Sequence, residues 1–423
     1  MPRLRLSWLC CMACAALAAT TAARAQLLGG HPLPKPPALP VRLPANVDVA
    51  ARVKTPRIDE LLRATTTHIP RTLQIRALLR DPSQRVALDP HGDPVLRGEF
   101  LATGLTTAQI ADLQREGFTV ERAPPDTDNL GLGMAIVRDT RRRGEAQALR
   151  ALQRHAPGAA FTYQHLYLSA GATTAGTAPT AATTNTATPR EGDLRIGLID
   201  GGVDGSDPSL AHARIVTHGC ARSVASRHGT VVASRLVAGD SDQLYVADLW
   251  CGDAVGGATS TLIDALAWMD REHVPVINIS LVGPDNPLLA RAVQAMIDRG
   301  HVLVAAVGNE GPAAPPLYPA SYAGVIGVSG VDGRRHVLPE SGAGPQVAFC
   351  ALGVVGDGRD GRDALRGTSF ASPIVARRAA RHVPAAHPGA AAEVMRQLAG
   401  EAIDLGRPGR DTRYGYGLLV PQD

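Results

Sequence analysis

The 423-residue sequence has few aromatic residues (4%) and a formal net charge of only +4. No basic cluster comes with interleaved aromatic residues, so the signature of a nucleic-acid-binding surface is missing and we expect no nucleic-acid partner. Beyond the first 25 residues no apolar run approaches the length that spans a bilayer. The hydrophobic content of 45% is still enough for a large core, and the length predicts more than one domain. We expect a monomer without a membrane span after its leader is removed.

Residues 1–25 have the pattern of a secretory signal peptide. Arg3 and Arg5 form the positive start, residues 8–19 the apolar centre, and residues 23–25 a small-x-small cleavage site. The apolar centre is short for a membrane span, although an uncleaved anchor is the alternative. We therefore expect an exported protein, either secreted or periplasmic.

The cysteines divide between this leader and the remaining chain. Cys14 lacks the Leu-led motif of a lipoprotein before it, and it would leave with the leader. Cys220, Cys251 and Cys350 remain, and export favours a disulfide while leaving one cysteine over. Cys220 and Cys251 each end a strand-like run, which predicts a bridge between them. Cys350 lies in an apolar run and is predicted to be a buried small residue.

The segments after the leader differ in composition. Residues 26–86 hold a proline-rich tether and a short helical region. Residues 87–169 contain a βαββαβ pattern, which is the order of a ferredoxin-like domain. The expected strands are 95–103, 118–122, 133–137 and 159–168, and the expected helices are 106–116 and 144–155. No His, Cys, Asp and Glu constellation is evident there, so we expect a structural or inhibitory role.

Residues 170–190 follow as a linker rich in Ala and Thr. Such a composition cannot bury enough apolar surface to fold. Because the linker joins two folded parts, we expect the chain to be cut between about Ser169 and Arg190.

Residues 191–423 alternate apolar strands with helices, which predicts a parallel sheet covered by helices on both faces. The expected strands are 194–199, 244–249, 274–280, 301–307, 325–329 and 346–351, and the expected helices are 230–238, 260–272, 287–299, 372–382 and 390–399. In such folds the active site lies at the carboxyl ends of the strands. The fold class is therefore α/β with a preceding α+β domain.

Four polar residues fall at positions that would meet at this edge: Asp200, His228, Asn309 and Ser369. Taken singly, each has an ordinary structural explanation such as a loop cap or a turn. Together they supply a nucleophile, a base, a carboxylate that orients the base, and an amide that donates to an oxyanion. Ser369 is expected at a helix N-terminus, with Pro373 in the first turn. The order Asp, His, Ser is that of subtilisin.

The motifs around these residues resemble those of the subtilisin-like serine peptidases, or subtilases, over residues 195–419. The matching stretches are Ile199-Asp200-Gly201-Gly202-Val203, His228-Gly229-Thr230, Asn278-Ile279-Ser280-Leu281, Gly308-Asn309-Glu310-Gly311, Gly367-Thr368-Ser369-Phe370-Ala371-Ser372-Pro373 and Tyr414-Gly415-Tyr416-Gly417-Leu418. The resemblance implies a secreted serine endopeptidase that forms an acyl-enzyme on Ser369. It further implies a ferredoxin-like propeptide that assists folding, inhibits the enzyme and is removed by autoprocessing.

The resemblance also implies how substrate binds and where this chain departs from the family. Protein or peptide substrates would add as a strand beside Ser280, Leu281, Val282 and Gly283, and beside the loop 255–257. Two departures narrow the primary specificity pocket. Leu317 and Val282 stand where glycine is common, so we expect small or medium residues before the cut bond.

Two further departures affect the support of the site. Gly201 replaces a small polar residue next to Asp200, so one hydrogen bond to that carboxylate is expected to be missing. The stretch between His228 and Tyr245 is short for the loop that often binds calcium. No metal and no cofactor are therefore predicted, and a weaker calcium site elsewhere stays open.

Three other functions remain as alternatives. A non-catalytic or propeptide-locked relative that binds peptides is the first. A serine esterase of another fold is disfavoured because no G-x-S-x-G motif surrounds Ser369. A sedolisin-like acid peptidase shares the Gly-Thr-Ser element, but His228-Gly229-Thr230 argues against it.

Overall fold

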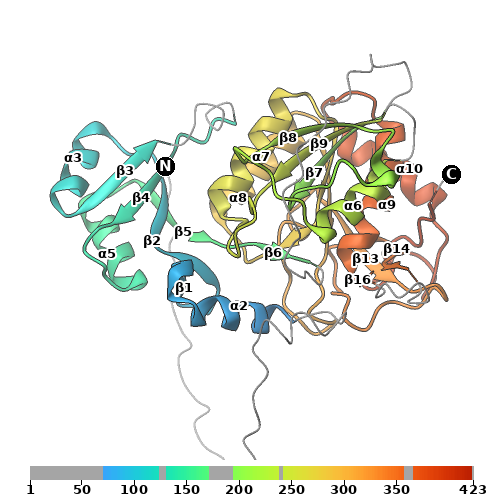
Figure 1. Ribbon diagram of the computed structural model, residues 1–423, viewed down its shortest axis with the longest axis horizontal. Helices are drawn as coiled ribbons and strands as arrows, with labels where there is room; N and C mark the ends of the chain where they lie inside the picture. The colour runs from blue at the N-terminus through green and yellow to red at the C-terminus, as the bar shows by residue number, and fades with distance from the viewer. Residues whose placement is uncertain (1–69, 123–129, 171–193, 238–241, 357–364, 422–423) are drawn as a thin grey trace, which may run out of the picture. The chain divides into compact units, whose positions relative to one another are not determined.

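The computed structural model describes residues 70–122, 130–170, 194–237, 242–356 and 365–421 (Figure 1). The predicted signal peptide and proline-rich tether lie outside the described residues, as does all of the predicted linker after Ala170. In the part that is described, no helix is both long and apolar enough to span a bilayer.

An antiparallel five-stranded sheet forms the first layer of structure. Its strands are β1 (Val86–Leu88), β2 (Pro94–Thr103), β3 (Phe118–Arg122), β4 (Met134–Asp139) and β5 (Ala160–His165), in the order β1-β2-β4-β3 with β5 also paired to β2. The helices α3 (Thr107–Arg115) and α5 (Glu145–His155) complete the predicted βαββαβ order. Thr106 and Gln109 close a capping box at the start of α3. Phe100, Leu113 and Leu152 are fully buried in the core of this unit, which we call the ferredoxin-like unit.

The structure corrects two expectations about this unit. A helix α2 (Arg71–Arg80) lies where a short helical region was expected, but the strand β1 after it was not expected from the sequence. The strand predicted over 159–168 is two strands, because β5 ends at His165 and a separate strand β6 (Leu168–Ser169) follows. β6 pairs with β11 (Leu281–Val282) of the next part of the chain rather than with the first sheet.

A parallel seven-stranded sheet forms the centre of residues 194–421. Its strands are β7 (Arg195–Asp200), β8 (Arg214–His218), β9 (Gln243–Asp248), β10 (Val276–Ile279), β12 (Val302–Ala306), β13 (Ile326–Val331) and β14 (Val347–Leu352), in the order β14-β13-β12-β10-β7-β9-β8. Except for the edge strand β8, of which only Ile215 is buried, these strands are buried along most of their length, as expected for a parallel sheet with two covered faces.

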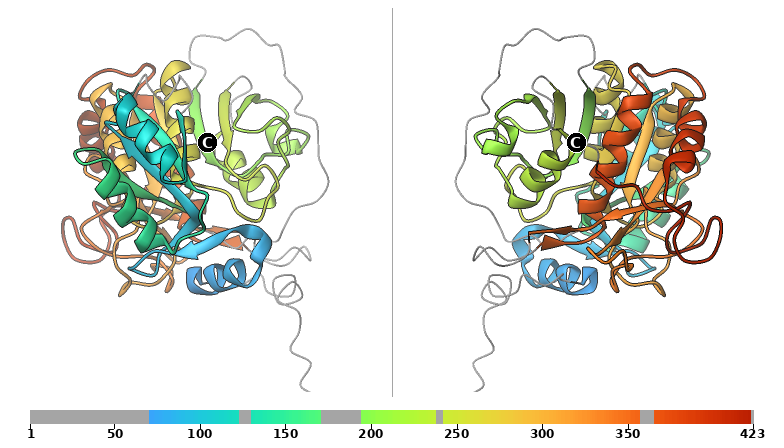
Figure 2. Two further views of the ribbon diagram at one scale, coloured as in Figure 1. Left: turned by 90° about the vertical axis from the view of Figure 1, so that its left-hand side faces the viewer. Right: turned by 90° about the vertical axis from the view of Figure 1, so that its right-hand side faces the viewer.

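Helices cover both faces of this sheet (Figures 1 and 2). The helices are α6 (Arg227–Leu236), α7 (Thr259–Arg271), α8 (Pro287–Asp298), α9 (Thr368–His382) and α10 (Ala390–Glu401). Apolar side chains of α6, α9 and α10 belong to one core cluster, and those of α7 and α8 to another. Two clusters on two sets of helices confirm the predicted layered α/β architecture, and we call residues 194–421 the α/β unit.

The strand order indicates where a ligand would bind. β7 lies between β10 and β9, so the chain moves to one side of β7 for β9 and β8 and to the other side for the later strands. The carboxyl end of such a switch strand is where open parallel sheets bind ligands. Asp200 is the last residue of β7.

The cysteines are placed as expected. Cys220 and Cys251 form a disulfide with an S–S distance of 2.00 Å, and their Cα atoms are 5.5 Å apart. The bridge ties the chain after β8 to the chain after β9. Cys350 is a free, buried cysteine on β14.

Candidate active site

Asp200, His228 and Ser369 form one hydrogen-bonded chain. Nδ1 of His228 lies 2.9 Å from Oδ1 of Asp200, and Nε2 lies 2.9 Å from Oγ of Ser369. A neutral imidazole that donates from Nδ1 to the carboxylate has an unprotonated Nε2 facing the serine hydroxyl. That is the tautomer in which histidine can take the hydroxyl proton.

His228 occupies the first turn of α6. The sequence placed this helix at residue 230, but it begins at Arg227 because Ser226 caps it: Oγ of Ser226 accepts from the backbone N–H of Gly229 at 2.9 Å. Ser226 also donates through its backbone N–H and its hydroxyl to the carbonyl oxygen of Gly202, at 2.8 and 3.1 Å. The cap therefore joins the helix that carries His228 to the loop that follows Asp200.

Ser369 occupies the first turn of α9. The helix begins at Thr368, four residues before the predicted start, so Pro373 lies inside the helix and not in its first turn. Proline has no N–H to donate to the carbonyl group four residues earlier, which belongs to Ser369. Oγ of Ser280 lies 3.4 Å from that carbonyl oxygen and donates to it instead.

Asn309 is held with its amide pointing at a peptide carbonyl group. Its Oδ1 accepts from the backbone N–H of Thr368 at 2.9 Å, which leaves Nδ2 to donate to the carbonyl oxygen of Ala170. Oγ1 of Thr368 in turn accepts from the N–H of Gly308 at 3.2 Å. Gly367 (φ +150°) is needed beside them, because a Cβ there would lie 2.9 Å from Nδ2 of Asn309 and 3.0 Å from the Ala170 oxygen. The motif Gly367-Thr368-Ser369 did not predict this role of Thr368.

The carboxylate of Asp200 is incompletely satisfied. Oδ1 accepts from both His228 and the N–H of Gly201, the latter at 2.6 Å, whereas Oδ2 is buried and has no hydrogen-bond partner among the described residues. The geometry also explains the glycine at 201. A Cβ there would lie 2.9 Å from Oγ of Ser226, so the cap of α6 occupies the space that a side chain would need.

The substrate-binding edge expected from the sequence is occupied by the chain itself. β6 pairs antiparallel with β11, with Leu281 opposite Ser169 and Val282 opposite Leu168. The N–H of Ala170 donates to the carbonyl oxygen of Ser280 at 3.1 Å. Oγ of Ser369 lies 3.0 Å from the carbonyl oxygen of Ala170. Ser169 and Ala170, assigned to the boundary of a linker from sequence, are therefore ordered within the site.

Apolar side chains enclose the methyl group of Ala170. Val282, Ala306 and Leu317 are buried and form one cluster with it. Leu317 is 7% exposed, and its Cδ1 would lie 2.7 Å from a Cβ on Gly308. The two departures that the sequence singled out, Val282 and Leu317, thus both fill the space around this residue.

Tyr167 fills a second position three residues earlier. Its ring is fully buried, its hydroxyl donates to the carbonyl oxygen of Pro284 at 2.9 Å, and its N–H donates to the carbonyl oxygen of Gly257 at 2.8 Å. Gly283 was expected to bind substrate through its backbone. Its N–H and carbonyl group instead bond to Tyr318, and its lack of a side chain admits the ring: a Cβ on Gly283 would lie 2.4 Å from Tyr167. The sequence gave no signal for this.

No group of three or more His, Cys, Asp and Glu residues is arranged to hold a metal ion within the described ranges. The expectation that this chain lacks the usual tight calcium site therefore remains a prediction. The hydroxyl, imidazole and carboxylate already form the chain of groups that acyl transfer requires.

Comparison with known proteins gives consistent results. The family model described as the subtilase family matches residues 192–417. Subtilisin DY of Bacillus licheniformis is 30% identical over 247 residues, which cover 54% of this chain and 89% of that protein. The minor extracellular protease Epr of Bacillus subtilis (strain 168) is 29% identical over 245 residues, which cover 54% of this chain but only 38% of Epr.

A solved structure extends the similarity of fold beyond the α/β unit. Fervidolysin from Fervidobacterium pennivorans superposes with a TM-score of 0.60 at 17% sequence identity, over 79% of this chain and 61% of fervidolysin.

Proposed function

The chain belongs to the subtilase family and is a serine endopeptidase, and from this premise we propose that it cuts its own chain directly after Ala170 and then acts on other proteins. One observation carries the proposal. The carbonyl group of Ala170 lies at the nucleophile, with Oγ of Ser369 3.0 Å from its oxygen and Nδ2 of Asn309 donating to that oxygen.

We assign the chemical roles from this geometry. Nε2 of His228 removes the hydroxyl proton as Oγ of Ser369 bonds to the carbonyl carbon of Ala170. The negative charge that develops on the carbonyl oxygen is stabilised by Asn309. His228 then passes its proton to the nitrogen of the following residue, the C–N bond breaks, and an acyl-enzyme remains on Ser369. Asp200 holds the imidazole and stabilises its charged form, and water later releases the acyl group through the same base.

Residues 167–170, which precede the proposed cut, indicate the expected substrate. The residue before the cut bond is Ala170, and Val282 and Leu317 leave little room for anything larger than a small side chain. Three residues earlier, Tyr167 is fully buried. We infer a preference for small residues at the first position before the cut, together with an aromatic residue at the fourth.

The ferredoxin-like unit is proposed to be the propeptide. Its last strand leads directly into β6, which pairs with β11, and this continuity supports the proposal. Export is proposed from the signal-peptide pattern of residues 1–25 together with the extracellular relative.

A peptide of sequence Tyr-Leu-Ser-Ala followed by a short polar tail tests the substrate proposal, alongside an unlabelled unfolded protein. We expect purified, processed enzyme to cut the peptide after Ala, and the Ser369→Ala variant to cut neither substrate. Binding of the peptide without cleavage by the wild type would instead support the alternative of a non-catalytic or propeptide-locked relative.

A further inference from the structure

The end of β5 docks on the first turns of two helices of the α/β unit. At α7, Nε2 of Gln164 donates to Oγ of Ser260 at 2.7 Å, and Oε1 of Gln164 accepts from the backbone N–H of Ser260 at 3.1 Å. Oγ1 of Thr259 donates to the carbonyl oxygen of His165 at 3.2 Å. These groups are buried, so their hydrogen bonds are sheltered from water.

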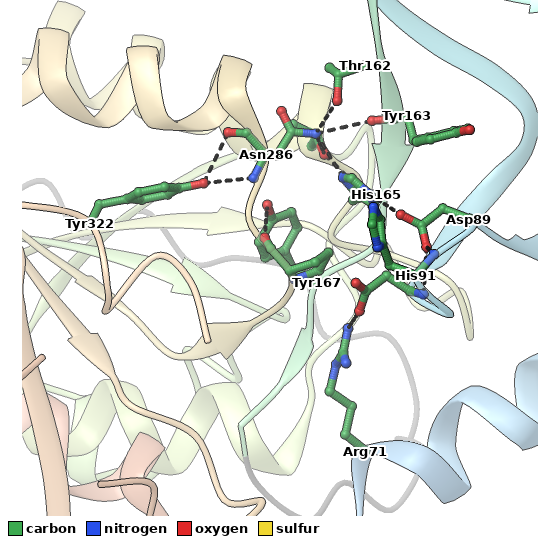
Figure 3. Close-up of polar contacts among 12 residues, drawn as sticks. Arg71, Asp89, His91, Thr162, Tyr163, His165, Tyr167, Asn286 and Tyr322 are labelled. Carbon is green, nitrogen blue, oxygen red and sulfur yellow. Dashed lines mark hydrogen bonds and ion pairs between the residues drawn. The ribbon is translucent and has the colours of Figure 1, made fainter. Parts of the chain in front are cut away.

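Asn286 provides the contact at α8 (Figure 3). Its Oδ1 caps the helix by accepting from the backbone N–H groups of Leu288 and Leu289, at 3.0 and 3.3 Å. The amide orientation is therefore fixed, and Nδ2 must face β5. There it donates to the carbonyl oxygen of Tyr163 at 3.1 Å and lies 3.0 Å from Nδ1 of His165.

This contact determines the protonation of His165. Because Nδ2 of Asn286 can only donate, Nδ1 of His165 must accept and therefore carries no proton. The proton is on Nε2, which lies 3.3 Å from Oδ2 of Asp89. A charged imidazolium would carry a second proton on Nδ1, facing the N–H of Asn286. Turning the Asn286 amide to accept that proton would remove the cap of α8.

The surroundings of His165 shift its pKa in opposite directions. Burial is the main cause that lowers the pKa of His165 below its usual 6.5, and Arg71 lowers it further. Asp89 and Asp93 oppose this, but Oδ1 of Asp89 is shared with the N–H groups of His91 and Asp93, and Arg71 pairs with Asp93 at 3.2 Å. The start of α8, with the positive end of its dipole, also faces the imidazole through its cap Asn286 and disfavours the imidazole's charge.

The Tyr163 ring is a further titratable neighbour, and its centroid lies 6.0 Å from that of His165. Burial raises the pKa of Tyr163, so its hydroxyl stays neutral wherever His165 titrates.

We propose that the N-termini of α7 and α8 form a docking site for the ferredoxin-like unit that accepts His165 only as the neutral imidazole, so that acidification releases this unit from the peptidase. The inference rests on the proposed role of the unit as the propeptide. It adds that the protonation of His165 controls when the cleaved propeptide leaves the site.

The direction of the effect follows from proton linkage. A free histidine takes up a proton near pH 6.5, whereas His165 in the docked state does so only at lower pH. Between these two values the undocked state binds more protons, so lowering the pH favours release. Across this pH range, the equilibrium constant for release is expected to rise about tenfold for each unit by which docking lowers the pKa of His165.

The test uses the full chain after self-cleavage. Wild-type protein is processed at pH 7.5, the uncleaved fraction is removed, and release of the propeptide is followed by size separation and intact mass between pH 7.5 and 5.0. We expect release to accelerate as the pH falls. His165→Asn places a neutral acceptor near the position of Nδ1, so its release should lose most of this pH dependence.

Two further variants sharpen the test. Asn286→Asp keeps a cap for α8 but presents a carboxylate to His165. It should release faster than wild type at pH 7.5 and more slowly as the pH falls, which reverses the sign. His155→Asn is the control, because Nδ1 of His155 also pairs with a carboxylate, Asp112 at 3.0 Å, but its side chain is 29% exposed. This control should retain the wild-type pH dependence.

Hydrogen exchange on the Ser369→Ala chain separates this proposal from self-cleavage. With times corrected for intrinsic exchange, the amides of β5 and of the first turn of α8 should lose protection below about pH 6.5. This loss should be absent with the additional His165→Asn change. If the proposed self-cleavage is wrong but the docking proposal is right, this pH-dependent loss of protection is still expected. Equal pH dependence in the wild-type and His165→Asn chains would overturn the docking proposal.

Discussion

The backbone N–H of Thr368 donates to Oδ1 of Asn309 at 2.9 Å, and this bond turns the other end of the amide toward the carbonyl oxygen of Ala170. The helix that carries Ser369 therefore orients the group proposed to stabilise the oxyanion. Asn309→Ala removes a donor that matters most when the oxygen is charged. Loss of such a donor costs subtilisin about 10²–10³-fold in kcat. We expect a loss of that order with little change in KM, measured on a peptide substrate; a kcat within threefold of wild type would contradict the assignment.

Leu317 is predicted to limit the residue before the cut bond. Leu317→Ala removes the side chain that closes the apolar cluster around Ala170. The ratio of kcat/KM for a substrate with Phe at this position to one with Ala should rise about tenfold or more, because the larger ring can occupy the vacated space. Leu398→Ala is the control: Leu398 is equally a buried leucine but lies on α10 in another cluster, so its loss should lower stability without altering the ratio.

Gly283 is predicted to admit an aromatic residue at the fourth position before the cut. A Cβ on Gly283 would lie 2.4 Å from the Tyr167 ring, so Gly283→Ala should overpack the site at a cost of about 1–3 kcal/mol. We expect kcat/KM to fall roughly ten- to a hundredfold for peptides with Tyr at this position and much less for peptides with Ala there. Gly400→Ala on α10, where a Cβ would meet nothing within 4 Å, is the matched control. Equal losses for the Tyr and Ala peptides would exclude this role.

The disulfide is predicted to stabilise the loop before His228. It closes a separation of 31 residues, for which chain entropy gives roughly 3–4 kcal/mol. The double variant Cys220→Ser with Cys251→Ser should lose about that much free energy of unfolding, measured by denaturant titration, and should no longer respond to a reductant. Burial raises the pKa of Cys350 to about 12, so this thiol should stay unreactive in the folded protein and should not exchange with the bridge. Unchanged stability of the double variant would refute the prediction.

The sequence was most informative where residues close in the chain decide the structure. The apolar strands and the motifs around Asp200, His228, Asn309 and Ser369 predicted the parallel sheet and the edge at which these side chains meet. Helix starts were less accurate. α6 begins at Arg227 rather than at the predicted residue 230, because Ser226 caps it. α9 begins four residues before its predicted start and contains a proline.

Contacts between distant segments were missed. Asp89 and His165 are 76 residues apart, so their pairing gave no local pattern, and the ferredoxin-like unit was expected to carry no such cluster. The role of Gly283 depends on the ring of Tyr167, which is brought to it by the pairing of β6 with β11. Neither relationship has a spacing or a composition that could be recognised before the chain is folded.

Intact mass over time, for the chain from Gln26 onward with and without Ser369→Ala, tests the central claim most directly. The wild type should yield a fragment that ends at Ala170 together with its complementary fragment, and the variant should stay at full length. If both chains stay intact, or if both are cut at the same place, then Ser369 does not cleave the bond after Ala170 and the proposed self-processing is wrong.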